Sequence, residues 1–153
     1  MDFISAKRQV DKFLKSIKVM FLATANTNGE PSLRQMSIIY FSDKIYFQTS
    51  EKFEKTKELL NNPHVALGVG AYSFKGEARL LGKPSDNLDI MNNFKLVHSD
   101  AYEKYSFLDD EILFEVEINE CKIWNGRDIE HDGKETITTI DFEKQEVSHK
   151  FCK

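Results

Sequence analysis

The stretch Ser32–Pro63 constrains the fold of this chain most, because its pattern predicts a strand, a tight turn, a second strand and a helix in direct succession. Residues 32–41 are rich in β-branched and aromatic side chains and partly alternate between apolar and polar, which is typical of a strand. Residues 42–43 interrupt this pattern, and residues 45–49 resume it. A short interruption between two strands predicts a β-hairpin.

A helix is predicted after this hairpin, with Thr49 and Ser50 as hydroxyl caps at its start and Pro63 just beyond its end. Arg34 on the first strand and Lys55 in the helix would then lie near the helix N-terminus. Each of these residues alone has an ordinary interpretation, as a solvated or ion-paired cation or as a simple cap. Together, two cations and two hydroxyls beside free backbone N–H groups predict a binding site for a phosphate.

The composition of the whole chain is that of a globular protein, with 41% hydrophobic and 12% aromatic residues. The length predicts one domain, residues 1–153. The net charge is −4, from 21 basic and 25 acidic residues, and nothing suggests a surface that binds polyanions. Neither nucleic acid nor an anionic membrane is therefore expected as a partner.

Cys121 and Cys152 form no metal-binding or redox motif, so we predict reduced thiols and a cytoplasmic protein. No apolar run reaches the ~18 residues that a membrane span needs, and the N-terminal segment is charged and amphipathic, unlike a signal peptide. The histidines show no metal-ligand spacing, and no metal site is predicted. They are His64, His98, His131 and His149.

Apolar periodicity and turn residues predict further elements along the rest of the chain. Helices are expected at residues 2–18 and from residue 84 through residue 94. Strands are expected at residues 19–25, 64–74, 77–82, 111–118 with an extension at 121–124, and 136–142. The connecting segments are a turn at 26–31, a bend at 75–76, a polar connection at 99–110, a charged turn at 130–134 and a polar tail to residue 153.

These elements predict a mainly β fold, an antiparallel β-barrel with peripheral helices, because about six strands are joined mostly by short turns. A doubly wound parallel sheet would need helices that alternate regularly with strands, and this chain lacks that alternation. The chain has no internal repeats and no linker.

Several short motifs add to this pattern through their order and spacing. They are Phe21-Leu22-Ala23-Thr24, Asn28-Gly29-Glu30-Pro31, Arg34-Gln35-Met36-Ser37, Phe47-Gln48-Thr49, Lys55 with Asn61-Asn62-Pro63, and Leu80-Leu81-Gly82-Lys83. In this order the chain resembles the pyridoxamine 5'-phosphate oxidase-like FMN-binding split-barrel family over residues 1–120. The resemblance implies a six-stranded antiparallel split barrel that binds FMN and forms homodimers, with cofactor sites at the subunit interface.

The resemblance also implies where FMN binds. In the family, the residue that matches Arg34 holds the FMN phosphate, and the strand that matches residues 34–37 lies along the flavin. The implied cofactor-binding residues are Arg34, Gln35, Met36, Ser37, Gln48, Thr49 and Lys55. Ser50 joins this set from the helix-terminus argument.

Several positions depart from the oxidase that gives the family its name. Ile39 stands where the oxidase has a lysine for the substrate phosphate, and Glu54 stands where it has a second cation. Glu77 takes the place of a glutamine, and Trp124-Asn125-Gly126-Arg127-Asp128 lacks the Arg-Leu-His run that follows in the oxidase. We therefore expect a flavin site without pyridoxamine phosphate oxidase activity.

The leading prediction for function is an FMN-dependent oxidoreductase that acts on an unidentified small molecule. A flavin can carry electrons without a catalytic side chain, and the sequence identifies no such residue. The alternative is a flavin- or haem-binding protein without turnover, and a deazaflavin in place of FMN also stays open. A third interpretation, a small β-barrel that acts as an interaction module, has no positive feature in its favour.

Overall fold

A computed structural model describes residues 1–126 and 133–152 of the chain. The helices are α1 (Phe3–Ser16), α2 (Glu54–Asn61), the short 3-10 helix η1 (Pro84–Asp86), α3 (Leu88–Val97) and α4 (Ser99–Tyr105). The strands are β1 (Val19–Ala25), β2 (Pro31–Ser37), β3 (Ile39–Phe41), β4 (Lys44–Ser50), β5 (His64–Val69), β6 (Tyr72–Gly82), β7 (Glu111–Asn125), β8 (Thr136–Asp141) and β9 (Glu146–Phe151). Arg127, Asp128, His131 and residues 130–132 of the predicted charged turn lie outside the described residues.

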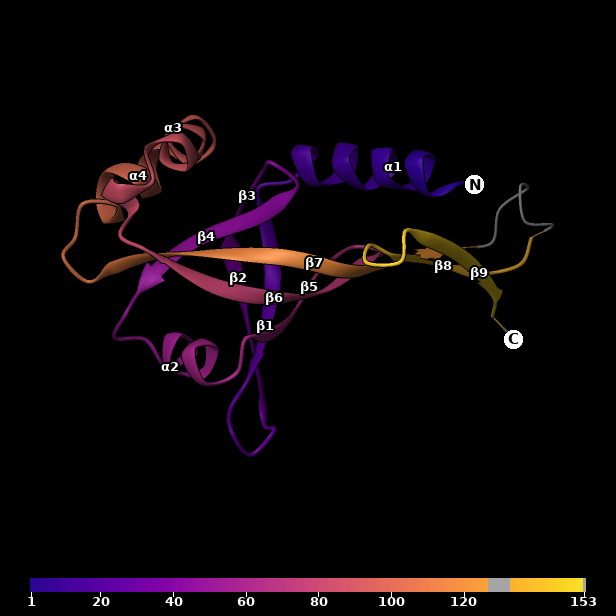
Figure 1. Cartoon of the computed structure of the whole chain (residues 1–153), viewed down its shortest axis with the longest axis horizontal. Helices are drawn as coiled ribbons and strands as arrows, with labels where there is room; N and C mark the ends of the chain where they lie inside the picture. Colours follow the sequence, from indigo (N-terminus) through magenta and orange to yellow (C-terminus); the bar gives the residue numbers. More distant parts are fainter. Residues whose placement is uncertain (127–132, 153) are drawn as a thin grey trace.

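The nine described strands form one antiparallel sheet in the order β2-β1-β5-β6-β7-β4-β3, with β8 and β9 added beside the second half of β7. The end strands β2 and β3 are consecutive in the chain, with a single residue, Ile38, between them. The sheet therefore curls until its ends meet, which closes a barrel, while the β8–β9 hairpin projects away from it (Figure 1). The predicted mainly β, antiparallel barrel with peripheral helices is confirmed.

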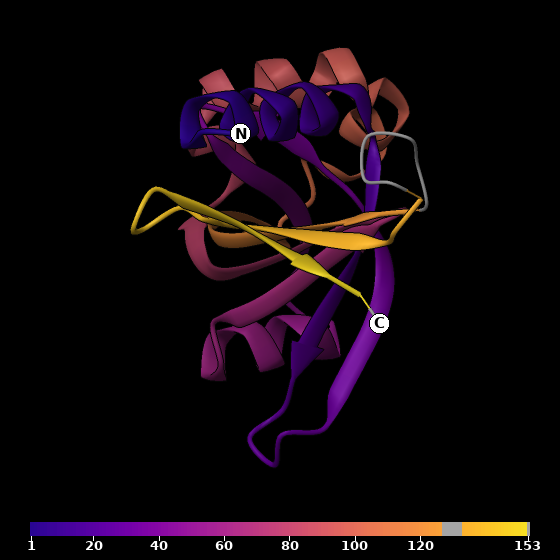
Figure 2. The ribbon, with the colours of Figure 1, turned by 90° about the vertical axis from the view of Figure 1, so that its right-hand side faces the viewer.

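The helices cover two opposite sides of the barrel. α1, α3 and α4 lie on one side and α2 lies on the other (Figure 2). Asp2 caps α1 by accepting a hydrogen bond of 2.8 Å from the backbone N–H of Ser5, and α1 buries Ala6, Val10 and Leu14. None of the helices in the described part of the chain combines the length and apolar character that crossing a bilayer requires.

Two apolar clusters hold the layers together. The larger cluster lies inside the barrel and includes Phe47 and Phe114, whose stacked rings have centroids 5.4 Å apart. The smaller cluster lies between the strands and α3, and its buried members are Ile39, Tyr46, Met91, Phe94 and Leu113. β7 contributes to both clusters, because consecutive strand residues point to opposite faces of a sheet.

Two of the predicted strands are each divided in two. The stretch 32–41 breaks at Ile38, whose backbone N–H donates to the Lys18 carbonyl at 3.0 Å. The stretch 64–74 breaks where Gly70, with a φ of 57°, begins a tight turn from β5 into β6. Apolar alternation continues across such tight connections, so the sequence pattern does not show where one strand ends.

Three further predictions are corrected by the structure. The bend predicted at residues 75–76 is a β-bulge within β6, which continues to Gly82. The polar connection 99–110 contains α4, and the polar tail contains β9. α4 buries none of its residues and β9 is largely exposed, so neither has the apolar stripe by which such elements are identified.

The helix after the hairpin also begins later than predicted. Thr49 and Ser50 belong to β4, whereas α2 begins at Glu54 with Phe53 in the cap position and no side-chain cap bond. The Ser50 hydroxyl instead donates a hydrogen bond of 2.6 Å to Asp110. The prediction that Thr49 and Ser50 cap the helix is therefore wrong.

Candidate functional site

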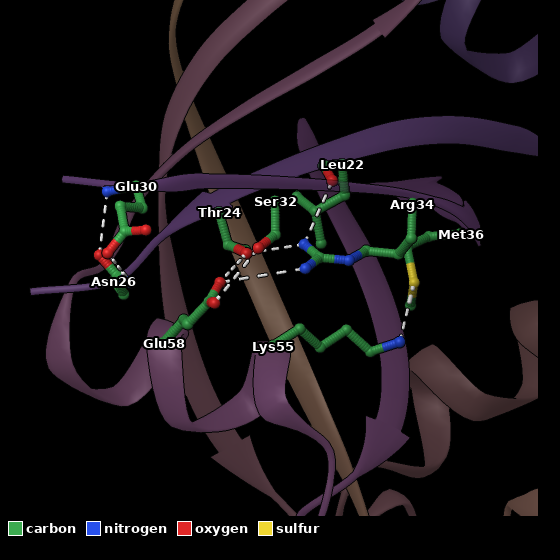
Figure 3. Close-up of polar contacts among 9 residues, drawn as sticks. All are labelled: Leu22, Thr24, Asn26, Glu30, Ser32, Arg34, Met36, Lys55 and Glu58. Atoms are coloured by element: carbon green, nitrogen blue, oxygen red, sulfur yellow. Dashed lines mark hydrogen bonds and ion pairs between the residues drawn. The ribbon is translucent and has the colours of Figure 1, made fainter. Parts of the chain in front are cut away.

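Arg34 on β2 lies across β1 and bonds to two of its groups. Its Nη1 donates a hydrogen bond of 2.7 Å to the Thr24 hydroxyl and one of 3.3 Å to the Leu22 carbonyl. Its Nη2 lies 3.9 Å from Oε2 of Glu58 on α2. Figure 3 shows Arg34, Thr24 and Glu58 directed toward one another. Strand alternation explains this arrangement, because Leu22 pairs with Arg34 and Thr24 follows two residues later on the same face.

Glu58 is the acidic member of this cluster and accepts hydrogen bonds from two hydroxyls. Thr24 donates to its Oε2, and Ser32 donates to its Oε1 at 3.4 Å. Thr24 is 2% exposed and Glu58 is 7% exposed. Burial lowers the pKa of Arg34, and the charge of Glu58 opposes this shift. The opposite charges of Arg34 and Glu58 thus compensate each other in a site with little access to water.

Lys55 on α2 directs its ammonium group toward β2 (Figure 3). Its Nζ lies 3.4 Å from Sδ of Met36 and 5.1 Å from the centre of the Phe53 ring. Burial lowers the pKa of Lys55, the nearby charge of Arg34 lowers it further, and Glu111 opposes both effects. Within the part of the chain that the structure describes, no carboxylate lies within ion-pair distance of Lys55. The site therefore contains two neighbouring cations. Arg34 has an ion pair with Glu58, whereas Lys55 has none among the described residues.

A pocket of about 390 Å³ opens beside Lys55. Its lining includes the predicted site residues Gln48, Thr49, Ser50 and Lys55. Nε2 of Gln48 and Oγ1 of Thr49 are buried there without a hydrogen-bond partner among the described residues. Buried polar atoms are nearly always hydrogen-bonded, so these donors and the unpaired ammonium fit a ligand that carries acceptor oxygens, such as a phosphate.

Two of the predicted residues lie elsewhere. Gln35 and Ser37 are on the face of β2 opposite to Arg34 and Met36, as strand alternation requires, and Gln35 pairs with the exposed Phe21. The structure thus brings together Arg34, Met36 and Lys55, and it gathers Gln48, Thr49 and Ser50 around the adjoining pocket. Contacts of all eight residues with a cofactor stay predictions.

Sequence patterns do not single out Glu111, Thr24 or Glu58, although all three belong to this site. Glu111 begins β7, lines the pocket and is 5% exposed. Burial and the charge of Asp110 raise the pKa of Glu111 to about 7, although Lys55 acts in the opposite direction. The spacing of three residues between Lys55 and Glu58, which places both on one side of a helix, is the one sequence signal that could have drawn attention to Glu58.

Comparison with known proteins covers most of the chain. The family model described as pyridoxamine 5'-phosphate oxidase matches residues 6–125. A pyridoxine/pyridoxamine 5'-phosphate oxidase of Crocosphaera subtropica is 42% identical over 55 residues, which are 35% of this chain and 26% of that protein. The corresponding protein of Rippkaea orientalis is 39% identical over 78 residues, which are 50% of this chain and 37% of that protein. The chain thus covers well under half the length of these curated relatives.

Solved structures share the fold at low sequence identity. ChuZ of Campylobacter jejuni superposes with a TM-score of 0.75 at 16% identity, over 98% of this chain and 64% of that chain. A pyridoxamine 5'-phosphate oxidase-related, FMN-binding protein of Nostoc punctiforme has a TM-score of 0.62 at 13% identity, over 97% of this chain and 96% of that chain. HutZ, described as the heme storage protein of Vibrio cholerae, has a TM-score of 0.63 at 16% identity, over 77% of this chain and 91% of that chain. The expected split-barrel fold is confirmed.

Proposed function

Because this chain belongs to the pyridoxamine 5'-phosphate oxidase-like family, we propose that it is an FMN-binding flavoprotein and acts as an oxidoreductase on a small molecule. One observation carries the proposal. Lys55, which has no ion pair among the described residues, lines one pocket with Gln48 and Thr49, and the amide nitrogen of Gln48 and the hydroxyl of Thr49 have no hydrogen-bond partner among those residues. A phosphate supplies the acceptor oxygens that these three donors lack.

Arg34, Lys55 and Thr49 are the residues that would hold the phosphate. Arg34 presents a planar fork of N–H groups, whereas Lys55 acts as a point charge. Thr24 and Glu58 orient the Arg34 guanidinium from the side of β1 and α2. When bound, FMN supplies hydride and electron transfer, and the contribution of this chain is to bind the cofactor and to balance its charge.

Oxidation of pyridoxamine phosphate is not part of the proposal. Ile39, at the position where the oxidase has a lysine for the substrate phosphate, is 3% exposed and belongs to an apolar cluster with Tyr46 and Phe94. A phosphate would find no cation there, and an apolar surrounding disfavours a charge. We therefore propose a different small molecule as the substrate.

The absorption spectrum of the purified protein tests the proposal, together with mass analysis of whatever denaturation releases. A flavin spectrum and the mass of FMN would support it, whereas a colourless protein that takes up no added FMN would contradict it. A deazaflavin or haem would give a different spectrum and a different mass. Reduction by NADH or NADPH with a panel of acceptors then separates an enzyme from a flavoprotein without turnover.

Haem binding is the second candidate, because HutZ has the same fold. Haem needs an axial ligand, and each of two described histidines has a hydrogen bond at one ring nitrogen, which leaves the other nitrogen able to bind a metal. Nε2 of His98 lies 2.8 Å from the Ile38 carbonyl, and Nδ1 of His149 lies 2.9 Å from the Thr138 hydroxyl. The pocket beside Lys55 is lined by none of the described histidines, including the exposed His64. The geometry therefore favours FMN over haem.

The outer face of β1 and β2 supports a homodimer, which we propose as the functional unit. Phe21 and Leu33 are 47% and 67% exposed on this face, and both line a shallow hollow beside β5. Large apolar side chains that gather on a surface are typical of an interface. A cytoplasmic location stays a prediction.

A further inference from the structure

Glu111 occupies the pocket that we propose for the FMN phosphate. It is 5% exposed and stands opposite Ser50 of β4 in the sheet register. Its side chain makes no hydrogen bond to any residue that the structure describes. The cation whose charge acts on it is Lys55, and Glu111 is in turn the acid whose charge acts on Lys55. Both groups line the same pocket, and their opposite charges act on each other from beyond ion-pair distance.

We propose that Glu111 takes up a proton when a phosphate-bearing ligand binds at Lys55. The inference rests on the proposed function and adds a regulation of that site by pH. A phosphate at Lys55 would place a further negative charge beside the buried carboxylate of Glu111. Both burial and a like charge disfavour the ionised carboxyl. One proton from the solvent converts the carboxylate into a neutral carboxyl and removes the repulsion.

One neighbouring acid of the pocket, Asp110, favours this response. Asp110 precedes Glu111 in the chain, and its charge already opposes ionisation of Glu111. Asp110 is held there by the Ser50 hydroxyl, which donates to it at 2.6 Å. Lys52 and Tyr105 are the other titratable side chains of the lining, besides Lys55. Because burial and Asp110 raise the pKa of Glu111 to about 7, a small perturbation near neutral pH suffices to change its protonation.

Calorimetric titration of the wild-type protein with FMN, in buffers of different ionisation enthalpy, measures this proton directly. At pH 7 we expect an uptake of roughly half a proton per FMN, because a group with a pKa near 7 is half ionised there. Riboflavin lacks the phosphate and should bind without this uptake. The FMN phosphate itself has a second pKa of about 6, so its own titration can only release protons on binding to cations.

Glu111→Gln keeps the shape of the side chain and removes its ionisation. We expect the uptake to vanish and the affinity for FMN at pH 8 to rise by up to about tenfold over wild type, with a smaller difference at pH 6. Glu51→Gln is the matched control, because Glu51 is an exposed acid on the segment between β4 and α2. This control should keep the proton uptake of the wild type.

The outcomes separate this inference from the proposed function. If FMN binds without proton uptake, or if Glu111→Gln leaves the uptake unchanged, the role of Glu111 is overturned and the FMN site stands. If FMN does not bind at all, both are overturned. The uptake and its riboflavin control are measured on the wild-type protein, so the result does not depend on how well the variant folds.

Discussion

The guanidinium of Arg34 donates a hydrogen bond of 2.7 Å to the hydroxyl of Thr24, and that hydroxyl in turn donates to the buried carboxylate of Glu58. These contacts connect β2 to β1 and α2, and they fix the direction of Arg34 without a ligand. A cation that is already ordered loses little conformational freedom when it binds an anion. The contacts around Arg34 therefore hold its guanidinium in a fixed direction at this end of the barrel.

Replacing Arg34 by alanine should weaken FMN binding far more than riboflavin binding. The loss of a charge-assisted hydrogen bond to the phosphate costs roughly 1.5–3 kcal/mol, or about 10- to 150-fold in affinity. Lys55→Ala should act in the same direction with a smaller effect, because a flexible ammonium has no fixed fork geometry. Titration of both flavins, followed by fluorescence quenching, measures the two affinities.

Arg8→Ala is the matched control for this experiment, because Arg8 is an exposed arginine on α1. It should bind both flavins as the wild type does. The Arg34→Ala protein should still fold, although its free energy of unfolding should fall by about 1–3 kcal/mol because Glu58 loses its cation. FMN binding by Arg34→Ala at wild-type strength would show that the phosphate lies elsewhere.

The purified protein should not convert pyridoxamine or pyridoxine phosphate into pyridoxal phosphate efficiently. Ile39 is 3% exposed within an apolar cluster and offers the substrate phosphate no charge. A missing charge-assisted bond costs roughly 1.5–3 kcal/mol in binding. The test follows the absorbance of pyridoxal phosphate while the FMN-loaded protein is incubated with either substrate. Robust formation of pyridoxal phosphate would contradict the prediction.

Gly76→Ala should destabilise the fold, because β6 bulges at Gly76 directly against β7. An added Cβ would lie 2.3 Å from the carbonyl oxygen of Glu117 and 2.9 Å from a methyl group of Val116. Overpacking of this kind costs about 1–3 kcal/mol. Gly68→Ala is the control, since its Cβ would meet no atom closer than 3.5 Å. Urea denaturation of both variants should give a clearly lower free energy of unfolding for Gly76→Ala alone.

The carboxylate of Glu115 should make stability sensitive to acid. It accepts hydrogen bonds from Arg79 at 2.9 Å, from Lys44 at 3.2 Å and from the Tyr46 hydroxyl at 3.0 Å. Burial on its own raises the pKa of Glu115, but these three donors outweigh it and bring the pKa below its ordinary value. A carboxyl with a lowered pKa stabilises the fold above its unfolded pKa of about 4.3, and this contribution is lost as the pH falls through the folded pKa.

Glu115→Gln should therefore lower the free energy of unfolding at pH 7 by about 1–3 kcal/mol and by progressively less below pH ~4.3. Urea denaturation at a series of pH values measures this difference from wild type. Glu117→Gln is the control, because Glu117 is an exposed acid two residues further along the same strand. A difference that stayed constant down to pH ~3 would exclude an ionised Glu115 as its source.

The fold could be predicted where the sequence carries regular patterns. Period-3.6 spacing identifies α1, because this helix buries one face. Period-2 alternation identifies β7, although the first six residues of this strand are buried on both faces. α4 and β9 were not predictable, since they bury little and local patterns record burial. The start of α2 was predicted too early, because Thr49 and Ser50 are capping residue types that belong to β4 instead, where the Ser50 hydroxyl donates to Asp110.

The site could be predicted in part for a similar reason. Arg34, Thr49 and Lys55 are residue types that bind anions, and their spacing places them near one helix end. Glu58 and Glu111 required the structure, because their roles depend on burial and on contacts between distant segments. The sequence shows which residues can carry a charge, whereas the folded structure determines which of these residues form ion pairs or hydrogen bonds.

The outer face of β1 and β2 should join two copies of the chain. Leu33 is 67% exposed there beside Phe21, which is 47% exposed, so a monomer would leave both in water. Burying such side chains stabilises an interface by about 25 cal/mol per Å² of apolar surface. Leu33→Asp would bring a charge into that interface and should shift the protein from dimer to monomer. Light scattering at micromolar concentration measures the mass.

Leu96→Asp is the matched control for the dimer, because Leu96 is 85% exposed on α3, on the side of the barrel that carries α1 and α4. It makes the same substitution and should leave the wild-type mass unchanged. The family resemblance implies a cofactor site at the subunit interface, so on that prediction Leu33→Asp should also weaken FMN binding while Leu96→Asp should not. A wild-type protein that scatters as a monomer with its flavin bound would refute the dimer and the shared site together.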